Sequence, residues 1–262
     1  MVLNERGMIT YGGRNLADFG VYISGNGTFN APERDVKMVA IPGRNGDLTL
    51  DNGRFKNIKI KYPAFIVEDF GRNVDALRDF LGTLRGYSRL EDTYHPDEYR
   101  MARISGAFTV KPEDKLRAGK FDLTFDCMPQ RWLKSGEAII DGAGSFGVAT
   151  SFDVLNPTEQ DALPNIKLNM DSNCTKTVFN INDVQFTINA PSVLQPIMID
   201  CAMQNVYGET DQANLNSYLV LDDGTFPVLK PGVNTISFTP YPQEGYWIGG
   251  CTVDIYPRWW CL

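Results

Sequence analysis

The sequence predicts a mainly β protein with one α-helix, organised as two domains, and three observations support this prediction. Short segments in which apolar and polar residues alternate recur along the 262 residues, as in Phe121, Leu123 and Phe125. Such alternation is typical of strands with one buried face. A helical period occurs in one segment only. The chain also exceeds the usual length of one domain, roughly 100–200 residues.

The first predicted domain covers residues 1–134 and is expected to form a β-sandwich or split-barrel-like unit with one helix and a hairpin. The Asn-Gly pair within residues 51–54 favours positive φ angles and predicts a hairpin turn before the alternating strand at residues 58–62. The helix is expected over residues 73–84, where apolar side chains recur at helical spacing. Strands are then expected over residues 87–91 and 99–110.

The second predicted domain covers residues 135–262 and is expected to be a β-sandwich or jelly roll. Proline and glycine between Pro129 and Gly136 interrupt the strand pattern and mark the boundary. The clearest hairpin is residues 177–190, which turns at Asn182-Asp183. Further strands are predicted at residues 166–170, 197–201, 218–221, 234–238 and 252–256. Many short strands separated by turns are typical of a sandwich.

Composition excludes several functional classes. The formal net charge is −7 and no basic block is present, so sequence-specific binding of nucleic acid is not expected. No run approaches the roughly 18 apolar residues of a membrane span, so we expect a soluble chain without a membrane partner. The five cysteines are an odd number without a C-x-x-C pair. They are interpreted as reduced core thiols of a protein that folds in the cytoplasm.

No catalytic residue, metal site or cofactor site is predicted, and the chain is interpreted as a non-enzyme. Its single histidine, His95, lies in a Pro-Asp turn and is expected to be exposed. Residues 142–147 match G-x-G-x-x-G, but a poor helix follows them, which favours a glycine-rich connector over a dinucleotide site. Asp222 and Asp223 precede a glycine in a predicted turn. A hydrolase that uses an unrecognised pair of carboxylates stays open as a third hypothesis.

Aromatic residues gather towards the C-terminus. Tyr241, Tyr246 and Trp247 are candidates for contact with a carbohydrate or a protein partner, because such side chains stack on sugar rings and also mark protein interfaces. Packing in a core or an interface is the competing interpretation. A lectin-like, carbohydrate-binding β-sandwich protein is therefore an alternative function.

Several ordered motifs together resemble the distal tail proteins (Dit) of long-tailed bacteriophages and prophages. The first is Ile41-Pro-Gly-Arg-Asn-Gly-Asp-Leu48, and the second is Cys127 followed by Pro-Gln-Arg-Trp-Leu and Ser-Gly-Glu up to Glu137. The others are residues 156–158, 163–166, 230–234 and the ending 257–262. These matches extend over essentially the whole chain in the order found in that family.

The resemblance implies a virion structural protein of the siphovirus tail tip, which is assembled in the cytoplasm of the host bacterium. It implies a baseplate hub in which N-terminal domains form a hexameric ring, with a galectin-like jelly roll as the C-terminal domain. One ring face would meet the tail tube protein and the other the tail-tip or tail-associated lysin protein. Receptor-binding proteins for host attachment would join the periphery.

A closed ring requires two different surfaces on each subunit. The candidate for one of them is the loop Pro42, Gly43, Arg44, Asn45, Gly46 and Asp47. Its glycines would allow close approach of a neighbouring backbone, and its arginine can pair with a carboxylate through two hydrogen bonds. The competing interpretation is a bent hairpin that needs glycine for its own geometry.

Overall fold

The computed structural model describes residues 7–24, 29–113 and 117–262, and the chain folds into two compact units. The first unit consists of residues 1–132 together with Leu262, and the second of Leu133–Cys261. Each unit has its own cluster of buried apolar side chains. Among the described residues, no helix is long and apolar enough to cross a bilayer. The expected mainly β fold is confirmed.

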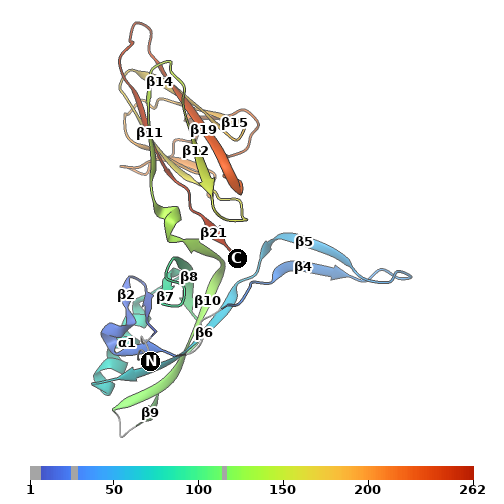
Figure 1. The fold of residues 1–262 in the computed structure, drawn as a ribbon, viewed down its shortest axis with the longest axis vertical. Coiled ribbons are helices and arrows are strands. Elements are labelled where there is room, and N and C mark those ends of the chain that lie inside the picture. Colours follow the sequence, from blue (N-terminus) through green and yellow to red (C-terminus); the bar gives the residue numbers. More distant parts are fainter. Residues whose placement is uncertain (1–6, 25–28, 114–116) are drawn as a thin grey trace. The chain divides into compact units, whose positions relative to one another are not determined.

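An antiparallel sheet with the strand order β2-β1-β7-β8-β10-β6-β3 forms the body of the first unit (Figure 1). Its strands are β1 (Ile9–Tyr11), β2 (Arg14–Asn15), β3 (Val21–Ile23), β6 (Ile58–Val67), β7 (Ser88–Asp92), β8 (Glu98–Ile104) and β10 (Ala118–Leu133). The short strand β9 (Lys111–Glu113) pairs with β10. Strands β6 and β10 pair over ten residues, from Ile58↔Cys127 to Val67↔Ala118. This long pairing forms the central part of the sheet.

The alternation in the sequence corresponds to the two faces of this sheet. On β6, Ile60 and Tyr62 are buried, whereas Lys59 and Lys61, which alternate with them, are exposed. On β10, Phe121, Leu123 and Phe125 are buried in the same way. The Tyr62 and Phe125 rings meet edge to face, with centroids 5.9 Å apart. Period-two patterning therefore predicted both strands correctly because one face of the sheet is buried.

The predicted helix is α1 (Phe70–Thr83), which begins three residues earlier than expected. Leu77 and Leu81, one turn apart, are its buried side chains. The preceding residue, Asp69, has a left-handed backbone and makes no side-chain cap. Instead, Nδ2 of Asn73 donates to the carbonyl oxygen of Glu68 at 3.0 Å. A 3-10 turn, η1 (Leu16–Phe19), adds Phe19, which stacks on Phe80 of the helix with ring centroids 5.3 Å apart.

The predicted turn at residues 51–54 is wrong. Residues 48–55 form one continuous strand, β5 (Leu48–Phe55), which pairs with β4 (Arg34–Val39) as a separate two-stranded sheet. The hairpin reverses at residues 40–47 instead. Gly53 does have a positive φ of 71°, but it accompanies a register shift between Arg34 and Val36. The sequence signal for positive φ was correct, and it marks a bulge rather than a turn.

Two sheets packed face to face form the second unit. The first has the strand order β11-β20-β13-β16-β17 and the second β12-β19-β14-β15-β18. The strands of the first are β11 (Ile140–Ser145), β20 (Gly250–Tyr256), β13 (Asn165–Met170), β16 (Ile197–Asp200) and β17 (Asn205–Gly208). Those of the second are β12 (Thr150–Asn156), β19 (Gly232–Pro242), β14 (Cys174–Ile181), β15 (Val184–Asn189) and β18 (Leu219–Leu221). Two 3-10 turns, η3 (Lys134–Glu137) and η4 (Asn216–Tyr218), complete the unit, whereas the short strand β21 (Trp260–Cys261) pairs with β10.

The predicted β14–β15 hairpin is confirmed. Its turn residues, Asn182 and Asp183, have φ angles of 50° and 69°, the pair of positive angles that a tight hairpin turn requires. Behind the turn, Phe179 and Phe186 stack in parallel with ring centroids 4.8 Å apart. Residues 142–145 of the glycine-rich segment belong to strand β11 (Ile140–Ser145), so the expected connector is wrong over these residues.

Candidate functional site

The candidate interface loop, residues 42–47, lies at the tip of the β4–β5 hairpin (Figure 1). All its residues are exposed. Gly43 and Gly46 have φ angles of 79° and 84°. A Cβ atom added at either glycine would meet nothing within 4 Å. Within the described chain these glycines therefore serve the backbone geometry of the turn and no close contact. The use of residues 42–47 as an interface stays a prediction.

The hairpin also carries a group of apolar side chains that the sequence analysis did not single out. Met38, Ile41, Leu48 and Leu50 are 54%, 38%, 40% and 46% exposed. Residues 40–54 are exposed without interruption. We call Met38, Ile41, Leu48 and Leu50 the hairpin apolar group. An isolated two-stranded hairpin is marginally stable in water, so its apolar side chains gain stability only from a surface outside the hairpin.

Ion pairs reinforce the part of the hairpin that is farther from its tip. Nε of Arg54 lies 2.7 Å from Oδ2 of Asp35, and Nζ of Lys56 lies 3.3 Å from Oε1 of Glu33. The hydrogen bond from Arg54 lowers the pKa of the Asp35 carboxyl group. Arg34 lies over the Phe55 ring at 4.7 Å. Because these contacts are exposed, they order the hairpin more than they stabilise the unit.

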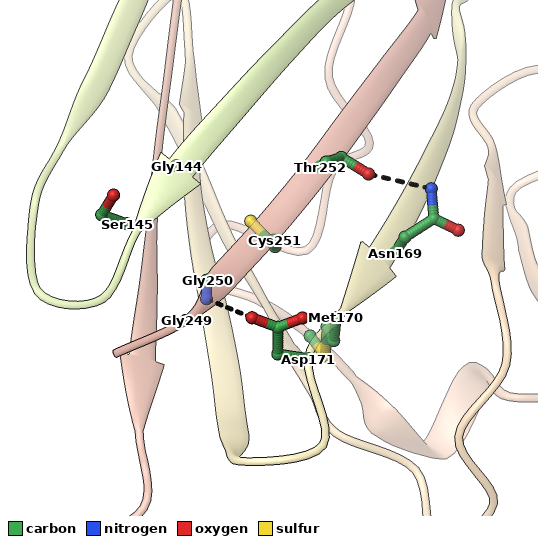
Figure 2. Close-up of a pocket in the computed structure, with 9 residues that line it drawn as sticks. All are labelled: Gly144, Ser145, Asn169, Met170, Asp171, Gly249, Gly250, Cys251 and Thr252. Carbon is green, nitrogen blue, oxygen red and sulfur yellow. Dashed lines mark hydrogen bonds between the residues drawn. The ribbon is translucent and has the colours of Figure 1, made fainter. Parts of the chain in front are cut away.

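The three aromatic candidates occupy two places in the second unit. Tyr241 lies near the end of β19, where its ring is 5.1 Å from Nζ of Lys176. Tyr246 and Trp247 lie in the loop between β19 and β20 and are 46% and 85% exposed. The loop leads into a hollow at the end of the sheet, which is shown in Figure 2. The sequence analysis missed this hollow because the strand ends that line it are far apart in the chain.

His95 is not exposed as expected. Its side chain is 15% exposed, and its Nδ1 lies 3.2 Å from Oδ1 of Asp92. The other carboxylate oxygen of Asp92 accepts a hydrogen bond from the hydroxyl group of Tyr62 at 2.7 Å. Asp92 also accepts hydrogen bonds from the backbone N–H groups of residues 94 and 95. The Asp92 carboxylate thus fixes the conformation of the turn, and the contacts of His95 are those of a structural residue. In the described ranges, no group of three metal-ligating side chains is found.

The similarity of this chain to known proteins is found in three-dimensional structure alone. No family model matches the sequence, and no curated protein matches it. The Dit protein of phage SPP1, described as a paradigm of the hub adsorption apparatus in phages that infect Gram-positive bacteria, superposes with a TM-score of 0.70. The match covers 98% of this chain and 99% of that chain, at 14% identity.

This chain has the fold of the SPP1 Dit protein. A chain of the phage P2 baseplate, in its activated conformation with Ca, is also similar, with a TM-score of 0.54. That match covers 95% of this chain and 97% of the baseplate chain, at 9% identity. The fold that the sequence motifs implied is thereby confirmed over both units. At such low identity, the fold carries over but individual residues do not.

Proposed function

We propose that this chain is a non-enzymatic hub of a phage tail tip, which assembles into a hexameric ring. The fold it shares with the SPP1 Dit protein over nearly its entire length supports this function. So does the likeness to a phage P2 baseplate chain. The observation that carries the proposal within this chain is the exposed β4–β5 hairpin.

The physical argument concerns the hairpin apolar group. Leu48 and Leu50 lie on one face of β5, and Met38 lies on the other face of the hairpin, opposite Thr49. Apolar side chains are thus exposed on both faces. A hairpin that packs on its own domain would show one buried face. Exposure of both faces fits insertion between two neighbouring subunits, as in a ring with heterologous contacts. Burial there would stabilise the assembly at about 25 cal/mol per Å² of apolar surface.

The remaining features of the proposal follow from the hub role. One ring face would meet the tail tube protein, and the other the tail-tip or tail-associated lysin protein. Receptor-binding proteins would attach at the periphery. The second unit would be a galectin-like domain. The chain would assemble in the host cytoplasm before it is incorporated into the virion. The tip of the hairpin, with Arg44, would supply a polar contact beside the apolar one.

Negative-stain imaging of the purified chain tests the proposal. We expect six-fold rings with a central opening. Leu50→Asp places a charge in the hairpin apolar group and should abolish the rings. Arg44→Glu should weaken them, because it reverses the charge at the tip. Leu155→Asp is the matched control, since Leu155 is 64% exposed on β12 of the second unit. Rings that persist in Leu50→Asp would remove the hairpin from the interface.

A further inference from the structure

A polar hollow of about 390 Å³ lies at one end of the sheet formed by β11, β20 and β13 (Figure 2). The last residues of β11, the first residues of β20 and the last residues of β13 surround it. Its volume falls in the range of roughly 300–1,000 Å³ that small-molecule sites occupy. Among its lining residues are Ser145, Asn169, Asp171, Gly249, Gly250 and Thr252.

The polar groups of the hollow are held in fixed positions. Oδ2 of Asp171 accepts a hydrogen bond from the backbone N–H of Gly250 at 2.6 Å. Nδ2 of Asn169 donates to the Thr252 hydroxyl group at 3.1 Å. Figure 2 shows the second carboxylate oxygen of Asp171 and the amide oxygen of Asn169 outside these two bonds. Each side chain is thus positioned by one atom and offers another to a ligand.

Glycine brings the backbone against these groups. Gly249 has a φ of 130°, and a Cβ atom there would lie 2.6 Å from Oδ2 of Asp171. A Cβ atom at Gly250 would lie 1.8 Å from the carbonyl oxygen of Gly144. Larger residues at either position would displace Asp171 or separate β11 from β20. The shape of the hollow therefore depends on small residues at the start of β20.

An exposed apolar segment, Tyr246-Trp247-Ile248, leads directly into the hollow. Trp247 is 85% exposed and Ile248 is 92% exposed. The Cα atom of Trp247 lies within about 7 Å of that of Gly249, because two residues span no more. The loop is anchored where the N–H of Phe146 donates to the carbonyl oxygen of Gly249 at 3.0 Å. Trp247 does not line the hollow itself, but an aromatic side chain so exposed, two residues along the chain from a lining residue, indicates a binding surface beside it.

The position of the hollow keeps it accessible within the second unit. The chain enters this unit at Leu133 and leaves it at Cys261. Strand β11 runs from Ile140, near the entry, to Ser145 at the hollow, and β20 runs back from the hollow to Tyr256. Six to seven residues of strand separate the two ends by about 20 Å. The hollow thus lies at the end of the unit opposite the entry and exit of the chain.

We propose that this hollow, together with Trp247, binds a neutral saccharide. The apolar face of a pyranose ring would stack on the indole, and its hydroxyl groups would bond to Asp171 and Asn169. Hydroxyl, amide and carboxylate groups suit sugar hydroxyls, and the nine lining residues include no lysine or arginine that would favour a phosphate or sulfate. The negative charge of the chain, −7, also disfavours an acidic glycan.

A glycan array probed with the full-length chain tests the proposal. The array carries neutral oligosaccharides of glucose, galactose and N-acetylhexosamines beside sialylated and sulfated ones, and calorimetry then measures affinity for the best neutral ligand. Trp247→Ala should weaken binding by about tenfold or more, which corresponds to about 1.4 kcal/mol, because it removes the aromatic face on which the sugar ring would stack. Asp171→Asn removes the charge but keeps an acceptor for Gly250, and should weaken binding by about fivefold or more.

Met203→Ala is the control, because Met203 is 75% exposed and lies between β16 and β17, outside the hollow. The affinity of Met203→Ala for the saccharide should equal that of the unchanged chain. The proposal is overturned if no neutral saccharide binds, if acidic glycans bind best, or if Trp247→Ala leaves the affinity unchanged. It does not depend on the ring, since Leu50→Asp should bind the saccharide as well as the unchanged chain does.

Discussion

Arg54 and Asp35 form an ion pair across the β4–β5 hairpin, with Nε and Oδ2 2.7 Å apart, beside the shift in strand register. The hydrogen bond from Arg54 lowers the pKa of Asp35 below its ordinary value. Because the pKa of Asp35 is lowered in the folded state, the pair contributes fully to the order of the hairpin at pH values above the unfolded-state pKa of about 3.9. That contribution disappears as the pH falls through the lower, folded-state value.

We therefore expect Asp35→Asn to reduce the amide protection of β4 and β5 at pH 7. At a pH below the folded-state pKa of Asp35, the variant and the unchanged chain should have equal protection. Hydrogen exchange, corrected for intrinsic rates, measures both. Lys61→Met is the control, because Lys61 pairs with Asp122 on the main sheet, at 2.8 Å, and not on the hairpin. Equal protection of the hairpin in all three proteins at pH 7 would show that the pair does not order it.

Asn234 lies in β19, is fully buried, and holds the Lys-Pro-Gly-Val-Asn segment of residues 230–234 at the start of that strand. Its Oδ1 accepts from the N–H of Lys230 at 2.7 Å, and its Nδ2 donates to the carbonyl oxygen of Lys230 at 2.8 Å. Asn234→Ala should lower the free energy of unfolding by about 2–3 kcal/mol, because buried polar groups lose their partners. Asn189→Ala, which removes one 3.4 Å bond to Tyr218, should cost less than about 1 kcal/mol.

Urea unfolding followed by tryptophan fluorescence measures this difference. Three of the four tryptophans, Trp247, Trp259 and Trp260, belong to the second unit, so the signal reports mainly on that unit. A cost for Asn234→Ala no larger than that for Asn189→Ala would show that the buried amide is not what holds the segment.

The buried cysteines should be chemically inert in the folded chain. Burial raises the pKa of Cys127, Cys201 and Cys251 to about 12 in each case. Burial also raises the pKa of Cys174. At pH 8 the thiolate fraction of these groups is therefore very small, and thiolate is the reactive form.

Reaction with a thiol-specific chromogenic reagent at pH 8 checks this prediction. We expect one thiol to react quickly, the half-buried Cys261, and all five to react after unfolding. A Cys261→Ser variant should leave almost no fast reaction. Fast labelling of two or more thiols in the folded protein would contradict the burial of these side chains.

The strands and the helix could be predicted because the spacing of apolar residues in each element reflects which of its faces is buried. Alternation at Phe121, Leu123 and Phe125 identifies β10, and the turn at Asn182-Asp183 identifies the β14–β15 hairpin. Gly53 shows the limit of this reasoning, since positive φ serves a bulge as well as a turn.

The candidate surfaces could be predicted only in part. Local sequence singled out residues 42–47 and Trp247 as candidate contacts, and both are exposed, but it placed the hairpin turn wrongly at residues 51–54. It could not show that Leu48 and Leu50 are exposed, because an alternating apolar strand ordinarily has a covered face. Nor could it place Asn169 beside Thr252, since that pairing depends on the order of strands in the sheet.

The most direct test of the hub proposal is the mass of the chain in solution, measured by light scattering after size exclusion over a concentration series. The chain mass is 29.3 kDa. We predict a species of six chain masses that grows with concentration, and a monomer for Leu50→Asp under the same conditions. A monomer at every concentration, with no difference between the two proteins, would contradict assembly through the hairpin.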